Sequence, residues 1–212
     1  MRLTKFGHAC VRIEHGDTTV VIDPGLFTEE DALHGADAVL ITHEHFDHFA
    51  EDRLRAAVAE DPGLRIWTNR AVAEQLEGIG SRVTVVGEGD AFDLGGLSVS
   101  VHGEWHAVIH PDIPRVRNTG FLLDGRLFHP GDALTLPPHP VETLLLPIAG
   151  PWTKVSELID YVREAGPRRA LAIHEAVLSE LGQQVHGRLL GTGGPGTGAE
   201  FAQLAAGEGV DL

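Results

Sequence analysis

The chain has 212 residues, of which 42% are hydrophobic and 22% charged, and this composition predicts a globular protein. We expect residues 1–212 to form a single domain. A formal net charge of −15 opposes general binding to nucleic acid or to anionic membranes, which requires clustered Lys and Arg. This charge does not exclude a small-molecule substrate, even an anionic one, because metal ions can reverse the local field. The sequence does not indicate an oligomeric state.

Cysteine content and apolar runs narrow the class further. Cys10 is the single cysteine, which excludes an intrachain disulfide and a thiolate zinc cluster, and its apolar neighbours favour a buried core position. No run approaches the ~18 apolar residues that span a bilayer. The first residues, Met1–Lys5, do not resemble a signal peptide. We therefore expect a cytoplasmic protein without a membrane span.

Short strands dominate the expected elements of the first half. Two helices are predicted, over Glu51–Glu60 and Arg70–Glu77, the first with an apolar face. Glycine-containing turns separate several of the strands. The predicted strands are Arg2–Phe6, Cys10–Glu14, Thr18–Ile22, Ala38–Ile41, Ile66–Trp67, Arg82–Val86, Asp90–Leu94, Leu97–Trp105, Phe121–Asp124 and Arg126–His129.

The second half returns to an α/β pattern. Lys154–Glu164 is an amphipathic helix with Thr153 as the expected N-cap and Gly166 as its stop, and a second helix is expected from about Ala176 to Leu190. Strands are predicted over Thr143–Pro147, Arg169–His174, Phe201–Leu204 and Val210–Leu212, with a glycine-rich loop at residues 191–198. The chain thus contains two successive halves of strands followed by α/β units. This order indicates an α/β fold in which two sheets are sandwiched between helices (αββα).

The strongest functional signal is the segment His43-Glu44-His45-Phe46-Asp47-His48. It follows an apolar strand and precedes a helix, at the strand end where open α/β sheets place their sites. Imidazole and carboxylate are ligand types that suit zinc, manganese or iron. On one tight loop, His43 and His45 can face one metal while Asp47 and His48 face another. The H-E-x-x-H zinc motif is excluded, because its second histidine would fall at Asp47.

Thr42–His48 resembles the T-H-x-H-x-D-H signature of the metallo-β-lactamase superfamily. Three further segments are similar to its UlaG-like metal-dependent hydrolases: Gly7–Ala9, Asp23–Gly25 and His129–Asp132. The resemblance covers nearly the whole chain and implies a four-layer αββα fold with a dinuclear metal site. It is highly specific for the fold and weakly specific for the substrate.

The resemblance implies three more ligands on later loops. Asp132, which follows Gly131 at a strand end, fits the aspartate that bridges both metals, and His174 fits the final histidine. His106 is expected as the remaining ligand because the family places it just after a strand, with His110 and His102 as alternatives. The full expected metal set is His43, His45, Asp47, His48, His106, Asp132 and His174.

Other residues have two open interpretations each. Asp23 is expected either to orient a metal-bound imidazole or to form a turn, and His8 either to face the mouth of the site or to lie in the core. Trp152 is expected to pack against the following helix, with a pocket-lining position as the alternative. Arg115, Arg117 and Asn118 could bind an anionic group, but exposed loop positions are expected for all three.

These ligands imply a hydrolytic reaction. Two divalent ions roughly 3.5–4 Å apart can share a carboxylate and a bridging water, whose pKa falls to about 7. The resulting hydroxide is expected to attack a carbonyl or phosphorus centre, with Asp47 or Asp132 accepting or relaying a proton. Zn²⁺ is the expected ion, with Mn²⁺ and Fe²⁺ as alternatives.

The ligand types also narrow the subclass. A cysteine ligand of the antibiotic-destroying type is absent, and oxygen-reducing di-iron relatives carry a glutamate at the position of His45. The resemblance leaves hydrolysis of a phosphodiester, a lactone or a related ester, such as an ascorbate-phosphate-type lactonase or a phospholipase-D-like phosphodiesterase. The alternatives are a non-catalytic metal-binding protein and an iron-dependent redox protein on the same fold.

Overall fold

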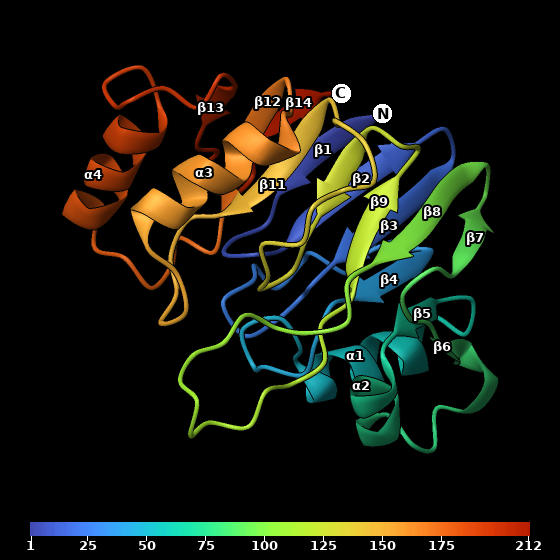
Figure 1. Cartoon of the computed structure of the whole chain (residues 1–212). Helices are drawn as coiled ribbons and strands as arrows, with labels where there is room; N and C mark the ends of the chain where they lie inside the picture. Colours follow the sequence, from blue (N-terminus) through green and yellow to red (C-terminus); the bar gives the residue numbers. More distant parts are fainter.

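The computed structural model describes residues 1–212 and contains two seven-stranded sheets that pack face to face (Figure 1). The first sheet has the order β14 (Gly209–Asp211), β1 (Arg2–Lys5), β2 (Val11–His15), β3 (Thr18–Ile22), β4 (Ala38–Ile41), β5 (Arg65–Thr68) and β6 (Val83–Val85). The second has the order β13 (Glu200–Ala202), β12 (Arg169–Ile173), β11 (Thr143–Pro147), β10 (Leu127–His129), β9 (Gly120–Leu123), β8 (Leu97–His102) and β7 (Ala91–Leu94).

The helices cover the outer faces of this pair of sheets. Helices α1 (Glu51–Glu60) and α2 (Arg70–Gln75) belong to the half of the chain that forms the first sheet, and a short 3₁₀ turn spans Gly80–Arg82. Helices α3 (Val155–Ala165) and α4 (Glu180–Leu190) lie on the side of the second sheet (Figure 1). The order of layers is therefore helix, sheet, sheet, helix, as the sequence predicts.

Alternating side chains build three apolar clusters between these layers. In β4, Ala38 and Leu40 belong to the cluster between the sheets, whereas Val39 and Ile41 belong to the cluster that includes Leu54 and Val58 of α1. The same alternation occurs in β12, where Leu171 and Ile173 face the other sheet and Ala170 and Ala172 join a cluster with α3. Strands buried on both faces explain the continuous apolar runs in the sequence.

Strand direction brings several chain segments to one end of the molecule. Strands β3, β4, β5 and β6 are parallel neighbours, as are β10, β11, β12 and β13. Parallel neighbours have their carboxyl ends at the same edge of a sheet. The segments that follow β3, β4, β10 and β12 therefore emerge together, and they carry most of the polar residues singled out in the sequence.

Several predicted element boundaries differ from the observed ones, and three of these differences have a clear local cause. The strand predicted to reach Trp105 ends at His102, because Gly103 has a left-handed φ of 86°. Helix α3 has Lys154 at its N-cap instead of Thr153, with the Glu157 side chain accepting from the Lys154 backbone N–H at 3.2 Å. Helix α4 begins at Glu180 and not near Ala176, because the Ser179 hydroxyl caps it by accepting from the Gly182 N–H. No helix combines the length and the apolar character that crossing a membrane requires.

Candidate metal centre

Eight side chains meet where the loops after the strands converge. They form two groups, within each of which the candidate ligand atoms lie within 4.8 Å of one another. The first group is His43, His45, His106 and Asp132, and the second group is His8, Asp47, His48 and His174. All seven residues of the expected metal set are present, together with His8. His43 and His45 fall in one group and Asp47 and His48 in the other, as their spacing suggests.

Asp132 lies between the two groups. Its Oδ2 is 3.4 Å from His106 Nε2 in the first group, and its Oδ1 is 3.1 Å from His48 Nε2 in the second. His174 Nε2 also approaches it, at 3.0 Å from Oδ2 and at 3.4 Å from Asp47 Oδ2. A single carboxylate thus faces both groups, which is the position that a bridging ligand requires.

Three neighbours fix the position of Asp132. The Asn118 Oδ1 accepts from the Asp132 backbone N–H at 3.0 Å, and the Trp152 Nε1–H donates to Asp132 Oδ2 at 3.2 Å. Gly131 has a φ of 64°, and a Cβ there would lie 2.2 Å from Asn118 Oδ1 and 2.8 Å from Thr42 Cβ. The turn before Asp132 therefore requires glycine, because both the left-handed backbone and the close contacts exclude a side chain.

Asp23 lies behind the second group and orients it by hydrogen bonds. This fully buried carboxylate accepts from the Thr42 N–H, the Thr42 hydroxyl and His48 Nδ1–H, each at 2.7 Å. Because the Thr42 hydroxyl proton is used on Asp23, its oxygen accepts from His43 Nδ1–H at 2.9 Å. His106 Nδ1–H likewise donates to the Ala107 carbonyl at 2.6 Å. In the neutral form, the imidazoles of His43, His48 and His106 therefore all direct the lone pair of Nε2 inward.

Unsatisfied polar atoms concentrate at this cluster. Five buried atoms of the expected ligands have no hydrogen-bond partner, namely His48 Nε2, His106 Nε2, Asp132 Oδ1 and both ring nitrogens of His174. Buried nitrogen and oxygen atoms are ordinarily paired, and leaving one unpaired costs about 1–3 kcal/mol. A cation between them removes this cost, and a set of imidazoles and carboxylates suits a divalent ion. The residues present therefore fit two metal ions.

The pKa values of the side chains around Asp132 indicate that this part of the cluster favours positive charge. Burial opposes protonation of His48 and His174, but the neighbouring carboxylates together outweigh it. Asp132 and Asp23 hold the pKa of His48 well above its usual value, and Asp132 and Asp47 raise that of His174 to about 9. Burial raises the carboxyl pKa values of Asp47 and Asp132. The neighbouring histidines lower them by more, so both pKa values lie below the usual range. In the first group burial dominates and holds the pKa of His43 well below its usual value. Protons or metal ions can supply the positive charge that the carboxylates require.

Backbone strain marks the same place. Four residues other than glycine have a positive φ, and three of them, His8 (46°), Asp23 (52°) and His174 (63°), belong to the cluster or its support. Such conformations cost of order 1–3 kcal/mol each and persist where the surroundings enforce them. These backbone conformations therefore lower the stability of the fold, and they orient the three residues at the cluster.

The structure also separates the alternatives for the histidine of the first group. His106 lies within it, whereas His102 contacts the Ser100 hydroxyl at 2.9 Å and His110 is exposed and accepts from the Asp112 N–H. The ring of Trp152 lies 5.8 Å from His106 and 6.1 Å from His174, so it packs against the cluster. This contact favours the pocket-lining position of Trp152 over packing against the following helix alone.

The arginine-containing loop departs from expectation at one residue. Asn118 is fully buried instead of exposed, because its side chain bonds both Asp132 and the Pro130 carbonyl. Arg115 Nε donates to the His106 carbonyl, and the Arg117 guanidinium lies 3.8 Å from the centre of the Trp105 ring. Both arginines are exposed, as expected, and make these contacts within the loop.

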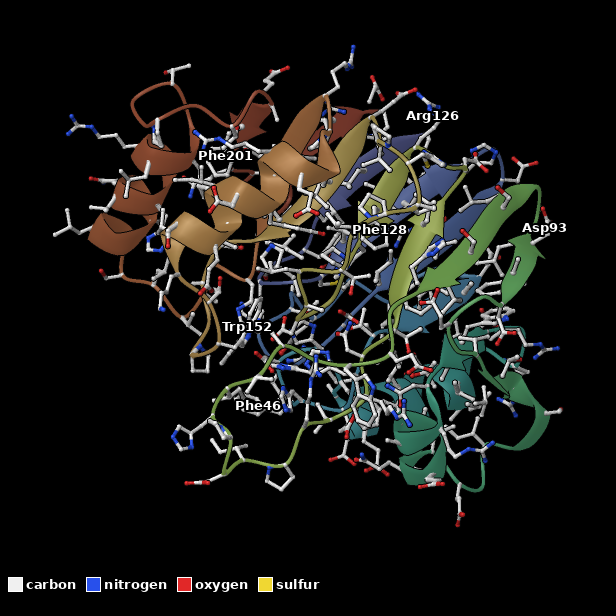
Figure 2. All side chains as sticks on the ribbon, viewed as in Figure 1. Phe46, Asp93, Arg126, Phe128, Trp152 and Phe201 are labelled. Atoms are coloured by element: carbon white, nitrogen blue, oxygen red, sulfur yellow. The ribbon has the colours of Figure 1, made fainter.

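Apolar side chains surround the mouth of the cluster. Phe46, between two candidate ligands, is 59% exposed, and its ring meets Phe27 edge to face at 5.7 Å. Leu26 on one side and Val108 and Ile113 on the loop after β8 are also exposed. Phe46 and Trp152 lie at this end of the molecule and Arg126 at the opposite one (Figure 2). The rim thus offers apolar contact in a chain that is otherwise strongly acidic.

Comparison with known proteins agrees with this fold. Residues 2–174 match the β-lactamase superfamily domain, and the chain belongs to this family. It is 40% identical to protein Rv0786c of Mycobacterium tuberculosis over 185 residues, which cover 84% of this chain and 86% of that protein. It is also 34% identical to a UPF0173 metal-dependent hydrolase of Roseobacter denitrificans over 141 residues, 60% of each chain.

A solved structure gives the same result for the fold. A metallo hydrolase from the archaeon Ignicoccus hospitalis superimposes with a TM-score of 0.75 at 21% identity, covering 99% of this chain and 97% of that one. The predicted membership of the metallo-β-lactamase superfamily and the predicted αββα fold are both confirmed.

Proposed function

We propose that the protein is a hydrolase that uses two divalent metal ions to cleave a phosphodiester, a lactone or a related ester. Its family, whose members include proteins named metal-dependent hydrolases, supports the general activity. The dinuclear part rests on the meeting of two ligand groups at one carboxylate, where five buried atoms of the proposed ligands have no hydrogen-bond partner. We propose His43, His45 and His106 for one ion, Asp47, His48 and His174 for the other, and Asp132 between them.

Bound ions would supply Lewis acidity and would lower the pKa of a coordinated water to about 7. The chain itself supplies orientation and proton acceptors. Asp132 faces both groups, and Asp47 Oδ2 lies beside His174, so both carboxylates are positioned to accept or relay a proton. Asp23 and Thr42 keep the imidazoles of His48 and His43 turned inward. We assign Asp47 and Asp132 as the catalytic residues.

Ligand chemistry favours Zn²⁺ as the native ion. The first group offers three imidazoles and one carboxylate, a set typical of catalytic zinc. Mn²⁺ and Fe²⁺ are the alternatives, since the second group is also built from imidazole and carboxylate.

The rim favours a small substrate with an apolar portion. Exposed Phe46 and Phe27 flank the cluster, and Arg115 and Arg117 are engaged elsewhere in the chain. An anionic group on the substrate would be neutralised by the ions. We expect neither nucleic acid nor membrane lipid as the physiological partner, given the net charge of −15.

A hydrolysis screen tests the proposal. Protein loaded with zinc, manganese or iron would be assayed on matched phosphodiesters, lactones and carboxylic esters that differ in the size of one apolar group. Asp47→Ala should lose the second ion and more activity than the ~10–100-fold typical of an outer-shell change. Asp52→Ala, an exposed carboxylate on α1, is the matched control and should keep full activity.

Other outcomes would redirect the assignment. Full hydrolysis by Asp47→Ala would overturn the role of that residue. Tight metal binding with no hydrolysis of any class would favour a non-catalytic protein. Oxygen consumption that depends on added reductant, in place of hydrolysis, would favour an iron redox protein.

A further inference from the structure

Among the residues of the two groups, His8 has a role that does not follow from its position alone. Its Nε2 lies 3.1 Å from Asp47 Oδ2, and its ring centre lies 4.1 Å from that of His174. A histidine in this place can bind the second ion directly or can hold Asp47 by a hydrogen bond. The two roles require opposite protonation of Nε2, because a metal ligand needs a lone pair there and a donor needs a proton.

The other ring nitrogen decides between these roles. The Ala176 backbone N–H donates to His8 Nδ1 at 3.3 Å, so Nδ1 carries a lone pair and no proton. A neutral imidazole then carries its proton on Nε2. A doubly protonated ring is also excluded by this contact, since it would set an N–H against an N–H. In His43, His48 and His106 the pattern is the reverse, with Nδ1–H directed outward and Nε2 free.

We propose that His8 binds no metal and instead donates its Nε2–H to Asp47, holding that carboxylate in place for the second ion. His8 is thus a positioning residue. This inference rests on the proposed dinuclear site, and it reduces the second group to Asp47, His48 and His174, with Asp132 shared between the ions.

Several contacts join the segment of Lys5 and His8 to the residues after β12. They hold the Ala176 N–H against His8 Nδ1 and so fix the tautomer of His8. The His174 N–H donates to the His8 carbonyl at 3.2 Å, and Lys5 Nζ pairs with Glu175 Oε1 at 2.6 Å. Together with the Ala176 bond, these contacts connect three consecutive residues, 174 to 176, to the segment of Lys5 and His8. The ring of Phe27 closes the remaining side, edge to face at 5.3 Å. Ala176 therefore presents its N–H to His8 and leaves Nε2 a single direction, toward Asp47.

Three substitutions separate the two nitrogens. In His8→Gln the amide nitrogen can replace Nε2 as donor to Asp47, but the bond from Ala176 is lost. In His8→Asn the side-chain oxygen can replace Nδ1 as acceptor, but the chain is too short to reach Asp47. His8→Ala removes both. The affinity of the second Zn²⁺ would be measured by calorimetric titration of metal-free protein, and thermal unfolding would be followed in parallel.

The proposal predicts that affinity and stability respond to different variants. His8→Gln should keep the affinity of the second ion within a few-fold, whereas His8→Asn and His8→Ala should weaken it by about 10–100-fold, the usual cost of losing an outer-shell partner. In unfolding temperature His8→Asn should instead lie nearest the wild type, because it keeps the acceptor for the Ala176 N–H. Equal loss of affinity in all three variants would show that His8 is a ligand.

Nitrogen NMR of the wild type gives a test that does not depend on variants. Long-range proton–nitrogen correlation should show Nδ1 unprotonated and Nε2 protonated in His8, with no coupling to bound NMR-active cadmium. Coupling from His8 Nε2 to cadmium would overturn the proposal. If the protein binds no ion at all, the dinuclear function fails, while the tautomer of His8 in the metal-free protein still tests the hydrogen bond.

Discussion

Asp23 shows how a residue that touches no expected ion can shape the site. Its carboxylate is fully buried and accepts three hydrogen bonds, one of which fixes the tautomer of His48. The sequence could offer only two equal interpretations, a turn or an orienting carboxylate. The choice depends on the pairing of β3 with β4, which sets Asp23 beside Thr42.

Asp23→Asn should weaken the second metal site. Asparagine keeps one acceptor oxygen, but its NH₂ group faces a donor at the other position, so His48 loses its fixed orientation. We expect about a 10–100-fold loss in affinity for the second ion, measured by competition with a chelating dye. Asp17→Asn, in the exposed β2–β3 turn, is the control and should bind as the wild type does. Unchanged affinity in Asp23→Asn would contradict the orienting role.

Residue spacing predicted the local part of the site and not the long-range part. The division of His43, His45, Asp47 and His48 between two groups follows from their places on one short loop. His8 and Asn118 could not be placed in this way. Their roles depend on contacts with Ala176, 168 positions away from His8, and with Asp132, on the other side of a hairpin.

At the scale of elements, apolar alternation located nearly every strand and helix, and the errors lie at their ends. Strands β3, β4 and β11 and helix α1 have the predicted bounds. Helix α4 starts late because residues 176–178 form a turn, in which the Ala176 N–H is used on His8. An element end is set by its hydrogen-bond partners, which can lie far away in the sequence.

Helix α3 should contribute to stability through its buried face without affecting the metal site. Leu158 is fully buried in the cluster between α3 and the second sheet, so Leu158→Ala should lower the free energy of unfolding by about 2–5 kcal/mol. Denaturant unfolding measures this change, and elemental analysis of the folded variant should show the wild-type metal content. Glu164→Ala, exposed on the same helix, should stay within about 0.5 kcal/mol of the wild type. A Leu158 variant as stable as this control would show that the helix face is not part of the core.

At the scale of the whole molecule, the centre connects the two sheets. His43, Asp47 and His48 come from the loop after β4 in the first sheet, whereas His106, Asp132 and His174 come from loops of the second. The sheets also share one apolar cluster with members from both. We therefore propose that residues 1–212 fold as a single cooperative domain in which bound ions hold the two sheets together.

Removing the metal should destabilise both sheets at once. An ion present at 100 times its dissociation constant adds about 2.7 kcal/mol, which in a chain of this size corresponds to roughly 5–10 °C in the unfolding temperature. Calorimetry should show one transition with ions and one transition at a lower temperature with chelator. Two separate transitions would contradict the single domain, and no shift would contradict tight binding of ions to the folded state.

Counting the metal ions per chain tests most directly whether Asp132 joins two metal sites. Protein purified without chelator would be analysed beside Asp132→Ala and beside Asp112→Ala, whose side chain is 91% exposed, as the control. We expect about two ions in the wild type and in the control, and fewer in Asp132→Ala. One ion or none in the wild type, unchanged by excess zinc, manganese or iron, would contradict this expectation.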